Sequence, residues 1–539
     1  MPRGSHRLWA LAGLGLLGSL LIAYAAPGAV DDAAVSWWYT PSFPSGRGVS
    51  VALVYAGMVL LSLSWLGLGR IVPTRGARAQ GPGPANRGTR AQGPGPATRG
   101  ERTAPAQASV GAPTRRDLLM IGALWLLPLA AGPALFSRDV YSYLAQGTLL
   151  NLGHNPYQAT PALLSQLGQA HVLLHAVSPF WRHTPAPYGP LFLQLINLIV
   201  AIAGSHLIVG VLLVRGLDLI GVALLVAFLP RLTRALGTDE ARATWLILSP
   251  LVMLELIAAG HNDLLMIGLL VAGVAVALEG RPLGGIALCA LAATVKVPAL
   301  AGAVFIAVAW ARAETGARAR ARFLAGAALV AALVLAAVSL ATGLGVSWLT
   351  STVFSTPARV HLAITPATAI GATLAAAAHA LGLGVSTHGL EAAFGILTAL
   401  ITAAVGLVLL YRVRVATLVV SLSAFLIAAA AGGPAAWPWY FAWGLVLLAA
   451  CAGPQRCTAV ALATVPAAFL VKPNGILALP IAAAPLVILA YAAIAAVLVL
   501  SRRRRRHPDC GVGGGDDGGG ARAGEPGLGV DARSALIRT

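Results

Sequence analysis

The sequence predicts an all-α membrane protein, a bundle of about 14 membrane-crossing helices with a long helical loop on its outer side. Of its 539 residues, 58% are hydrophobic and only 10% are charged, and its mean hydropathy is +0.80. A soluble globular protein has about a quarter of its residues charged. The composition therefore excludes a soluble globular protein and favours a membrane protein built from apolar spans of roughly 20 residues each.

The N-terminal segment 1–69 contains two apolar runs, at residues 8–26 and 49–69, and we expect both to cross the membrane. The first run ends in AYAA, which resembles a cleavage site, so a removed signal peptide is the alternative. Because the run is long enough to span the bilayer, we favour a retained signal-anchor helix.

Residues 70–117 differ sharply in composition from the runs that flank them. They contain nine Arg and an imperfect tandem repeat, RGARAQGPGPA and then RGTRAQGPGPA, which cannot pack a core. Positively charged loops stay in the cytoplasm. We therefore expect a disordered cytoplasmic linker with no catalytic role, and the net charge of +19 requires no nucleic-acid partner.

The next apolar run, 118–136, leads to the outer side of the membrane, and residues 137–206 follow as a long outer loop. The loop contains the stretch LFLQLINLIVAIAGS, which is too short to cross comfortably and fits a helix lying at the interface. Counting this stretch as a span would place RLTRALGTDEAR outside, against the positive-inside bias.

The remaining spans have Arg at their cytoplasmic turns. They belong to a catalytic module, 118–341, and a C-terminal module, 342–500, and a tail at 501–539 is expected to be disordered and cytoplasmic. The predicted spans are 207–229, 243–259, 264–279, 283–295, 298–311, 323–341, 389–411, 415–433, 439–452, 457–471 and 477–500.

Asp139 is the strongest candidate for acid–base chemistry, because few carboxylates fall on the outer side. It begins the long outer loop in SRDVYSYLAQG, directly after a span. A carboxylate at such a partly desolvated edge can have a raised pKa and serve as a general base. The alternative is an interfacial Asp that pairs with neighbouring Arg138.

Asp263 is the second candidate. It lies in AAGHNDLLM, where a short outer turn holds His261, Asn262 and Asp263 together at the membrane surface. A plain hairpin turn would use Asn and Asp for backbone geometry alone. Glu255, within the preceding span, is costly unless paired and could support this turn.

Lysine usage gives an independent indication. The chain has 37 basic residues but only two Lys, Lys296 in TVKVPAL and Lys472 in LVKPNG, both at predicted outer edges. Such positions suit the binding of a lipid-linked phosphate. Snorkelling of the ammonium to lipid headgroups is the alternative.

The outer loop also contains WRHTPAPYGP, with Trp181, Arg182, His183 and Tyr188 between prolines. Aromatic rings beside a cation and an imidazole could bind a sugar ring or a phosphate. On another outer loop, His361 in STPARVHLAITP could act as a base or phosphate ligand, although a lone His is more often structural.

Two other polar or aromatic features have simpler interpretations. Arg215 and Asp218 share a helix face at i, i+3 within a span, which indicates an internal ion pair. The WPWY run at 437–440 is typical of interfacial anchoring by aromatic side chains.

Several motifs are missing from the sequence. It has no GxxxxGK[ST], no GxGxxG after a strand and no DxD pair for a metal-bound nucleotide sugar, and its four Cys show no metal-ligand spacing. We expect neither a metal nor a cofactor, and any energy source must arrive already activated in the membrane.

Five motifs, SRDVYSYLAQG, GHNPY, WRHTPAPYGPL, GHND and KVPAL, occur in this order. Together they resemble the actinobacterial polyprenyl-phosphomannose-dependent alpha-1,6-mannosyltransferases, which belong to the GT-C class of integral-membrane glycosyltransferases. The resemblance runs from about residue 118 to 475 and leaves the N-terminal 117 residues without a carried-over role.

The resemblance implies a polyprenyl-phosphomannose donor, a lipid-anchored alpha-1,6-mannan acceptor of the lipomannan type, and an active site on the outer face of the plasma membrane. It implies that Asp139 is the catalytic base of an inverting transfer and that Asp263 supports the base or the acceptor, with Asn262, Arg138, His183, Tyr188 and Trp181 as further sugar-binding or supporting residues. Candidate ligands of the donor phosphate are Lys296, His361, His261 and Arg182.

Two alternatives stay open. A related transferase could use another polyprenyl-phosphate sugar, such as arabinofuranose, because no pocket residue separates the two sugars. A flippase or transporter of lipid-linked sugar would also need many spans, although such proteins generally have internal repeats and we find none among these spans.

Overall fold

A computed structural model describes residues 3–30, 46–72, 112–351, 364–433, 435–451 and 453–506. Every named element in these ranges is a helix, which confirms the all-α fold class. The chain divides into two compact units, Met1–Ile488 and Leu489–Thr539. All the site residues discussed below belong to the first unit.

Within the described ranges, six helices are long and apolar enough to cross a membrane, and a seventh span results if one bent pair is counted. The protein is therefore a multi-pass membrane protein, and the larger count of about 14 spans stays a prediction. The six are α1 (Arg3–Ala29), α2 (Arg47–Ile71), α9 (Leu207–Leu236), α14 (Ala317–Ala341), α17 (Thr387–Arg412) and the segment Val415–Gly432, which contains α18 (Leu418–Gly432).

The tandem repeat and most of the Arg-rich linker lie outside the described residues, as does the tail beyond residue 506. Helix α3 (Arg115–Ala131) begins slightly earlier than expected. A capping box explains this start: the Thr114 hydroxyl accepts a hydrogen bond from the Asp117 N–H, and the Asp117 side chain accepts one from the Thr114 N–H.

The predicted span 243–259 is not one straight helix. It is divided into α10 (Glu240–Ile247) and the π-helix η1 (Leu251–Ala258), which are bent by 53°. Pro250 lies at the break and explains it, because proline lacks a backbone N–H and clashes with the carbonyl four residues earlier. The bend brings the end of η1, and the GHND turn after it, toward the Asp139 loop.

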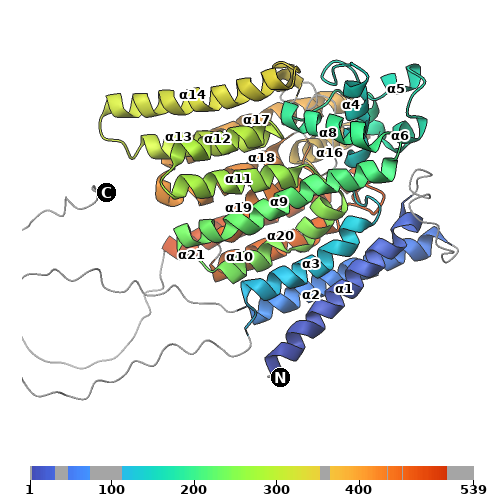
Figure 1. The fold of residues 1–539 in the computed structure, drawn as a ribbon, viewed down its shortest axis with the longest axis horizontal. Helices are drawn as coiled ribbons and strands as arrows, with labels where there is room; N and C mark the ends of the chain where they lie inside the picture. Colours follow the sequence, from blue (N-terminus) through green and yellow to red (C-terminus); the bar gives the residue numbers. More distant parts are fainter. Residues whose placement is uncertain are drawn as a thin grey trace, which may run out of the picture. The chain divides into compact units, whose positions relative to one another are not determined.

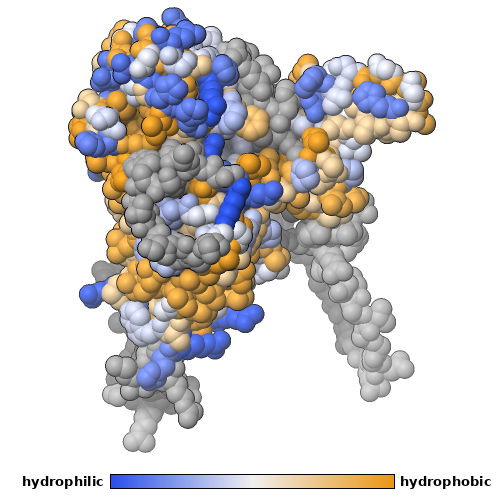
Figure 2. All heavy atoms as spheres, turned by 90° about the vertical axis from the view of Figure 1, so that its right-hand side faces the viewer, coloured by the Kyte–Doolittle hydropathy of each residue, from blue (hydrophilic) through white to orange (hydrophobic). Residues whose placement is uncertain are grey.

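Residues 137–206, which we predicted as a helical outer loop, form five short helices. Figure 1 shows α4, α5, α6 and α8 gathered at one end of the bundle. They are α4 (Asp139–Asn151), α5 (Leu163–Gln166), α6 (His171–Ala176), α7 (Pro179–Arg182) and α8 (Pro190–Ala203). Figure 2 views the molecule from the corresponding side and shows hydrophilic and hydrophobic residues interspersed over its upper part.

In the first unit, α9, α11, α12 and α13 lie side by side (Figure 1). Helix α16 was not predicted. The bounds of the remaining helices are α11 (Asp263–Leu278), α12 (Pro282–Ala293), η2 (Val297–Ala299), α13 (Leu300–Ala311), α15 (Ser347–Thr350), α16 (Pro366–Ala380), η4 (Val415–Thr417), η5 (Pro438–Phe441), α19 (Ala442–Ala450), α20 (Pro454–Ala468), η6 (Ile481–Ala483) and α21 (Ala484–Arg506).

Glycine allows α9 and α11 to pack backbone against backbone. A Cβ atom added to Gly221 would lie 2.4 Å from the carbonyl oxygen of Leu264, and one added to Gly268 would lie 2.7 Å from that of Gly221. Small residues at such contacts are typical of helix packing inside membranes. The contact fixes the first turn of α11, which begins at Asp263.

We expect Gly221→Ala to lower the thermal unfolding temperature in detergent, because the added methyl must displace the α11 backbone at a cost of about 1–3 kcal/mol. Gly216→Ala is the matched control, since a Cβ at this other α9 position meets nothing within 4 Å. Equal unfolding temperatures for both variants would contradict the close packing.

Candidate active site

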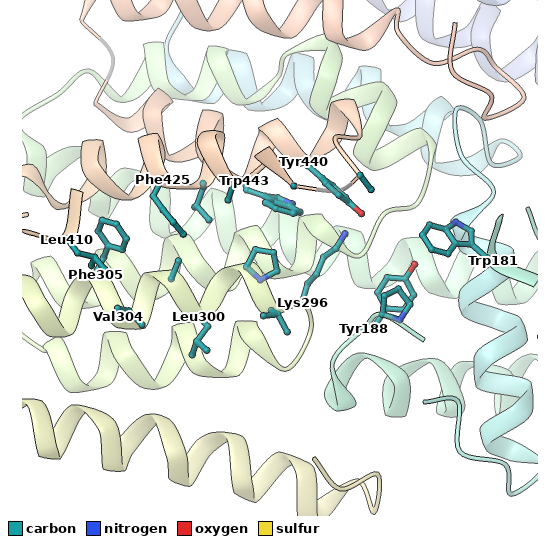
Figure 3. Close-up of a pocket in the computed structure, with 18 residues that line it drawn as sticks. Trp181, Tyr188, Lys296, Leu300, Val304, Phe305, Leu410, Phe425, Tyr440 and Trp443 are labelled. Carbon is teal, nitrogen blue, oxygen red and sulfur yellow. The ribbon is translucent and has the colours of Figure 1, made fainter. Parts of the chain in front are cut away.

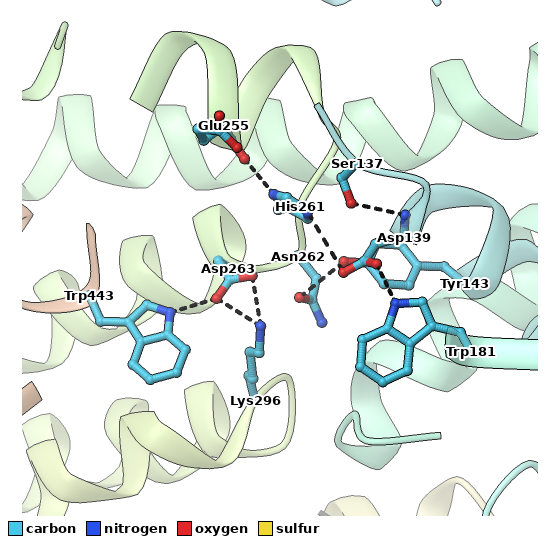
Figure 4. Close-up of polar contacts among 10 residues, drawn as sticks. All are labelled: Ser137, Asp139, Tyr143, Trp181, Glu255, His261, Asn262, Asp263, Lys296 and Trp443. Atoms are coloured by element: carbon cyan, nitrogen blue, oxygen red, sulfur yellow. Dashed lines mark hydrogen bonds and ion pairs between the residues drawn. The ribbon is translucent and has the colours of Figure 1, made fainter. Parts of the chain in front are cut away.

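Two carboxylates from separate helices meet near the end of the bundle that holds α4 (Figure 4). Asp139 is the first residue of α4 and Asp263 is the first residue of α11. Asp139 is 8% exposed and Asp263 is 0% exposed. The structure thus brings together both predicted carboxylates, and His261, Asn262 and Lys296 with them.

Asp139 has different partners on its two carboxylate oxygens. Its Oδ1 accepts a hydrogen bond of 2.8 Å from Trp181 Nε1, and its Oδ2 lies 3.7 Å from His261 Nε2. Its backbone N–H donates to Ser137 Oγ at 3.1 Å. One oxygen is therefore fixed by an indole, while the other faces a titratable ring.

Burial raises the pKa of the Asp139 carboxyl above its ordinary value. The nearby His261 and Lys296, and the hydrogen bond from Trp181, lower this pKa and offset part of the rise, whereas Asp263 adds to it. A carboxylate with a raised pKa is a stronger proton acceptor than an ordinary Asp. This is the electrostatic property that a general base requires.

His261 is held in one tautomer by its surroundings. Its Nδ1 is hydrogen-bonded to the backbone carbonyl of Glu255, and a carbonyl can only accept, so the proton lies on Nδ1. Burial lowers the pKa of His261, which favours the neutral ring. In that state Nε2 presents a lone pair toward Asp139, and the ring stacks on Trp439 at 4.0 Å between ring centroids.

Asp263 is saturated by strong donors. Lys296 Nζ lies 2.8 Å from each of its carboxylate oxygens, and Trp443 Nε1 donates to Oδ1 at 2.5 Å. The ammonium also lies 4.5 Å from the centre of the Tyr440 ring, in a cation–π contact. Lys296, which we expected to bind a lipid-linked phosphate, therefore already has a buried counter-ion in Asp263. The Lys296–Asp263 pair is the electrostatic centre of the site.

A cavity of about 490 Å³ begins at Lys296 and extends between the helices (Figure 3). Its two ends differ in character. Around Lys296 lie Trp181, Tyr188, Tyr440 and Trp443, and the far end is apolar, with Leu300, Val304, Phe305, Leu410 and Phe425 from α13, α17 and α18. Such a shape accommodates a ligand with a polar head and an apolar tail.

Asn262 lies between the two carboxylates (Figure 4). Its Oδ1 accepts a hydrogen bond of 3.5 Å from the hydroxyl of Tyr143, whose ring packs edge-on against Tyr188 and Phe192. Within the described ranges, Nδ2 of Asn262 is buried without a hydrogen-bond partner. A buried amide donor without a partner is available to a ligand hydroxyl or phosphate oxygen.

Arg182 and His183 are not among the residues that meet at this centre. Arg182 donates to the backbone carbonyls of Val177 and His175, at 3.1 and 3.0 Å, and so supports the loop. His183 is exposed, and Arg138 is half-buried at the N-cap of α4. His361 lies outside the described residues.

Sequence reasoning missed the aromatic wall of the site. The WPWY run is not an interfacial anchor: Trp437 and Trp439 are 6% and 2% exposed, and Trp439 stacks on His261. The sequence feature that could have indicated a turn packed inside the protein is Pro438, which begins the turn η5 before α19. Glu255 supports the turn, as suggested, but through its backbone carbonyl.

Among the described residues, no group of three His, Cys, Asp or Glu side chains is arranged to hold a metal ion.

Comparison with known families decides the assignment. Residues 12–312 match the model described as alpha-(1→6)-mannopyranosyltransferase, N-terminal domain, and residues 367–502 match that of the MptB C-terminal domain. The chain belongs to the alpha-(1→6)-mannopyranosyltransferase family. The resemblance drawn from the five motifs is confirmed, and it extends further toward the N-terminus than those motifs.

Relatives in three organisms agree with this membership. Alpha-(1→6)-mannopyranosyltransferase A of Mycobacterium tuberculosis is 33% identical over 83% of this chain and 81% of its own. A probable alpha-(1→6)-mannopyranosyltransferase of Mycolicibacterium smegmatis is 33% identical over 75% and 71%. Alpha-(1→6)-mannopyranosyltransferase B of Corynebacterium glutamicum is 30% identical over 89% and 79%. No solved structure was found to match the chain.

Replacing Trp181 by Phe removes the N–H that donates to Asp139. The pKa of Asp139 should then rise, so mannosyl transfer should fail at a higher pH as the medium is acidified. The maximal rate should also fall, about 10- to 100-fold, because the indole no longer holds the carboxylate in its orientation. The measurement is the pH dependence of the rate.

Trp245→Phe is the control, because it removes an equivalent bond of 2.8 Å to the carbonyl of Trp65, outside the site. If the acid side of the pH–rate profile is unchanged in Trp181→Phe, or shifts equally in both variants, Trp181 does not tune the pKa of Asp139.

Proposed function

We propose that this protein transfers mannose from polyprenyl-phosphomannose to the 6-hydroxyl of an alpha-1,6-mannan chain on a lipid anchor, with inversion, on the outer face of the plasma membrane. The observation that carries the proposal is the position of Asp139. It is a buried base, paired with His261, close to the polar end of an apolar cavity.

The cavity suits a lipid-linked donor. Its apolar end, formed by residues such as Phe305, Leu410 and Phe425, would take the first isoprene units of the donor. Its polar end would take the phosphate and sugar. Lys296 uses two of its three N–H groups on Asp263, and the third can reach a phosphate oxygen.

The reaction then needs only groups already in place. The acceptor oxygen attacks the anomeric carbon, the bond from that carbon to the phosphate oxygen breaks, and the phosphate leaves with the electron pair. Asp139 takes the hydroxyl proton through Oδ2. Because neutral His261 presents Nε2 to the same oxygen, it can accept a hydrogen bond from the newly protonated carboxyl.

The charge developed on the leaving phosphate must be stabilised. Lys296 and the amide N–H of Asn262 are the groups available for this task, and both are buried, where an electrostatic interaction is stronger than in water. Asp263 fixes the ammonium in position. In this scheme Asp263 is a positioning residue and Asp139 is the base.

The distribution of charge supports an outer location for the site. The site lies at the N-terminal ends of α4 and α11. Helices α9, α11 and α13 have basic residues at or just after their C-terminal ends: Arg231 and Arg234 on α9, Arg281 after α11 and Arg312 after α13. Arg-rich ends are typical of the cytoplasmic side, and this supports an outer location for the opposite end, where the site lies.

Asp139→Asn should abolish transfer from synthetic polyprenyl-phosphomannose to an alpha-1,6-mannoside while the protein stays folded and inserted. Asp117→Asn, in the capping box of α3, is the matched carboxylate control and should retain activity. Polyprenyl-phosphoarabinose should be a poor donor in the same assay. Full turnover by Asp139→Asn would remove it as the base, and preference for the arabinose donor would overturn the proposed sugar.

Lys296→Met should destabilise the protein by about 3–5 kcal/mol, because it leaves the carboxylate of Asp263 buried without a counter-ion. The double variant Lys296→Met/Asp263→Asn should recover most of that stability and still have a raised KM for the donor. Unfolding in detergent and steady-state kinetics give the two quantities. A donor KM that returns to normal in the double variant would show that the lysine only balances charge.

A further inference from the structure

Arg215 lies within α9 and is 2% exposed, yet it does not act as a simple partner of Asp218. Its guanidinium donates to four backbone carbonyls instead, and neither carboxylate oxygen of Asp218 accepts a hydrogen bond within the described residues. The ion pair suggested by the i, i+3 spacing is therefore not the main interaction of this arginine.

The four carbonyls come from two segments that are far apart in sequence. Arg215 Nη1 donates to Ala130 O at 2.9 Å and also to Gly132 O, and Nη2 donates to Pro133 O at 2.9 Å and to Ala258 O at 2.6 Å. The first three lie within four residues at the end of α3 and just after it, and Ala258 is the last residue of η1. Carbonyls at helix ends have no partner within the helix, and they attract positive charge.

Each of these segments leads directly to one half of the site. The chain continues from Pro133 to Asp139 within six residues, and from Ala258 to His261 within three. The two segments also contact each other, because the Leu135 N–H donates to the same Ala258 carbonyl at 3.2 Å.

The side-chain stem of Arg215 lies beside the same junction. Gly260 has φ +75°, and a Cβ added there would lie 3.8 Å from Arg215 Cγ and 3.7 Å from Val140 Cγ2. Val140 follows Asp139, and Gly260 precedes His261. The stem of Arg215 and Val140 therefore both lie beside Gly260, the residue before the imidazole.

We propose that Arg215 is a positioning residue that sets the separation of Asp139 and His261 by joining the end of α3 to the end of η1. The inference rests on the proposed function, in which Asp139 is the base. Guanidinium has five N–H donors in a rigid plane and can join several carbonyls at once, whereas an ammonium has three donors on one atom. Lysine therefore keeps the charge but cannot maintain the junction.

Arg215→Lys tests the role in full-length protein purified in detergent. We expect kcat to fall about 100-fold, the size of loss that a displacement of about 1 Å can cause. The donor KM should not change, since neither Arg215 nor the carbonyls that it binds line the cavity. Arg231→Lys is the matched control: it lies on the same helix, is bound to Glu279 at the surface, and should keep its activity.

The pH profile separates positioning from general stability. Asp139 is influenced by His261, Lys296 and Asp263, and by the Trp181 hydrogen bond, and it faces the hydroxyls of Tyr143 and Tyr188. Of these groups, His261 and Asp263 lie on the segment that Arg215 ties through Ala258, and His261 Nε2 lies 3.7 Å from Asp139 Oδ2. If Arg215→Lys changes this separation, the pKa of Asp139 changes, and the acid side of the pH profile of kcat shifts.

The outcomes separate this inference from the proposed function. A reduced kcat with a displaced acid limb, measured per monodisperse protein, supports positioning by Arg215. An unchanged profile, or a rate loss that only follows the loss of folded protein, overturns it. If Arg215→Lys does not fold, Arg215→Gln is judged by the same two readouts. Activity in Asp139→Asn would instead overturn the function itself.

Discussion

The site depends on the compensation of buried charges by ionic partners and hydrogen-bond donors. Asp139, Asp263 and Lys296 are each 8% exposed or less, and an uncompensated charge under such conditions costs several kcal/mol. Asp263 meets this constraint with an ammonium and an indole. Asp139 receives an indole on one oxygen and only a neutral ring opposite the other. Similar carboxylates thereby acquire different tasks, one fixed in a structural pair and one left able to take a proton.

Much of this arrangement could be read from the sequence, because hydrophobicity and charge act over whole segments. The helical class and the two acidic turns at Asp139 and Asp263 follow from apolar runs and from the polar residues that interrupt them. The motifs around these residues also indicate the family. A local pattern was sufficient to predict a site residue where a polar residue type, such as a carboxylate beside an apolar run, has few alternative roles.

Partnerships across the fold could not be predicted in the same way. The sequence gives no sign that Trp443, 180 residues away, donates to Asp263, or that Arg215 prefers carbonyls to the nearby Asp218. The 53° bend between α10 and η1 was also missed, although Pro250 marks it. In each case three-dimensional packing determines which groups interact, because the sequence pattern is compatible with several arrangements.

The cavity leading from Lys296 has one further property. Val304, one of its apolar lining residues, is 43% exposed and lies on the apolar helix α13, so this cavity is not sealed within the protein. A lipid-linked molecule could slide in sideways from the surrounding bilayer. Its hydrocarbon would then never be wetted, a step that costs about 0.8 kcal/mol per methylene. Encounter would be governed by two-dimensional diffusion and by local membrane composition, and hardly at all by the aqueous solubility of the substrate.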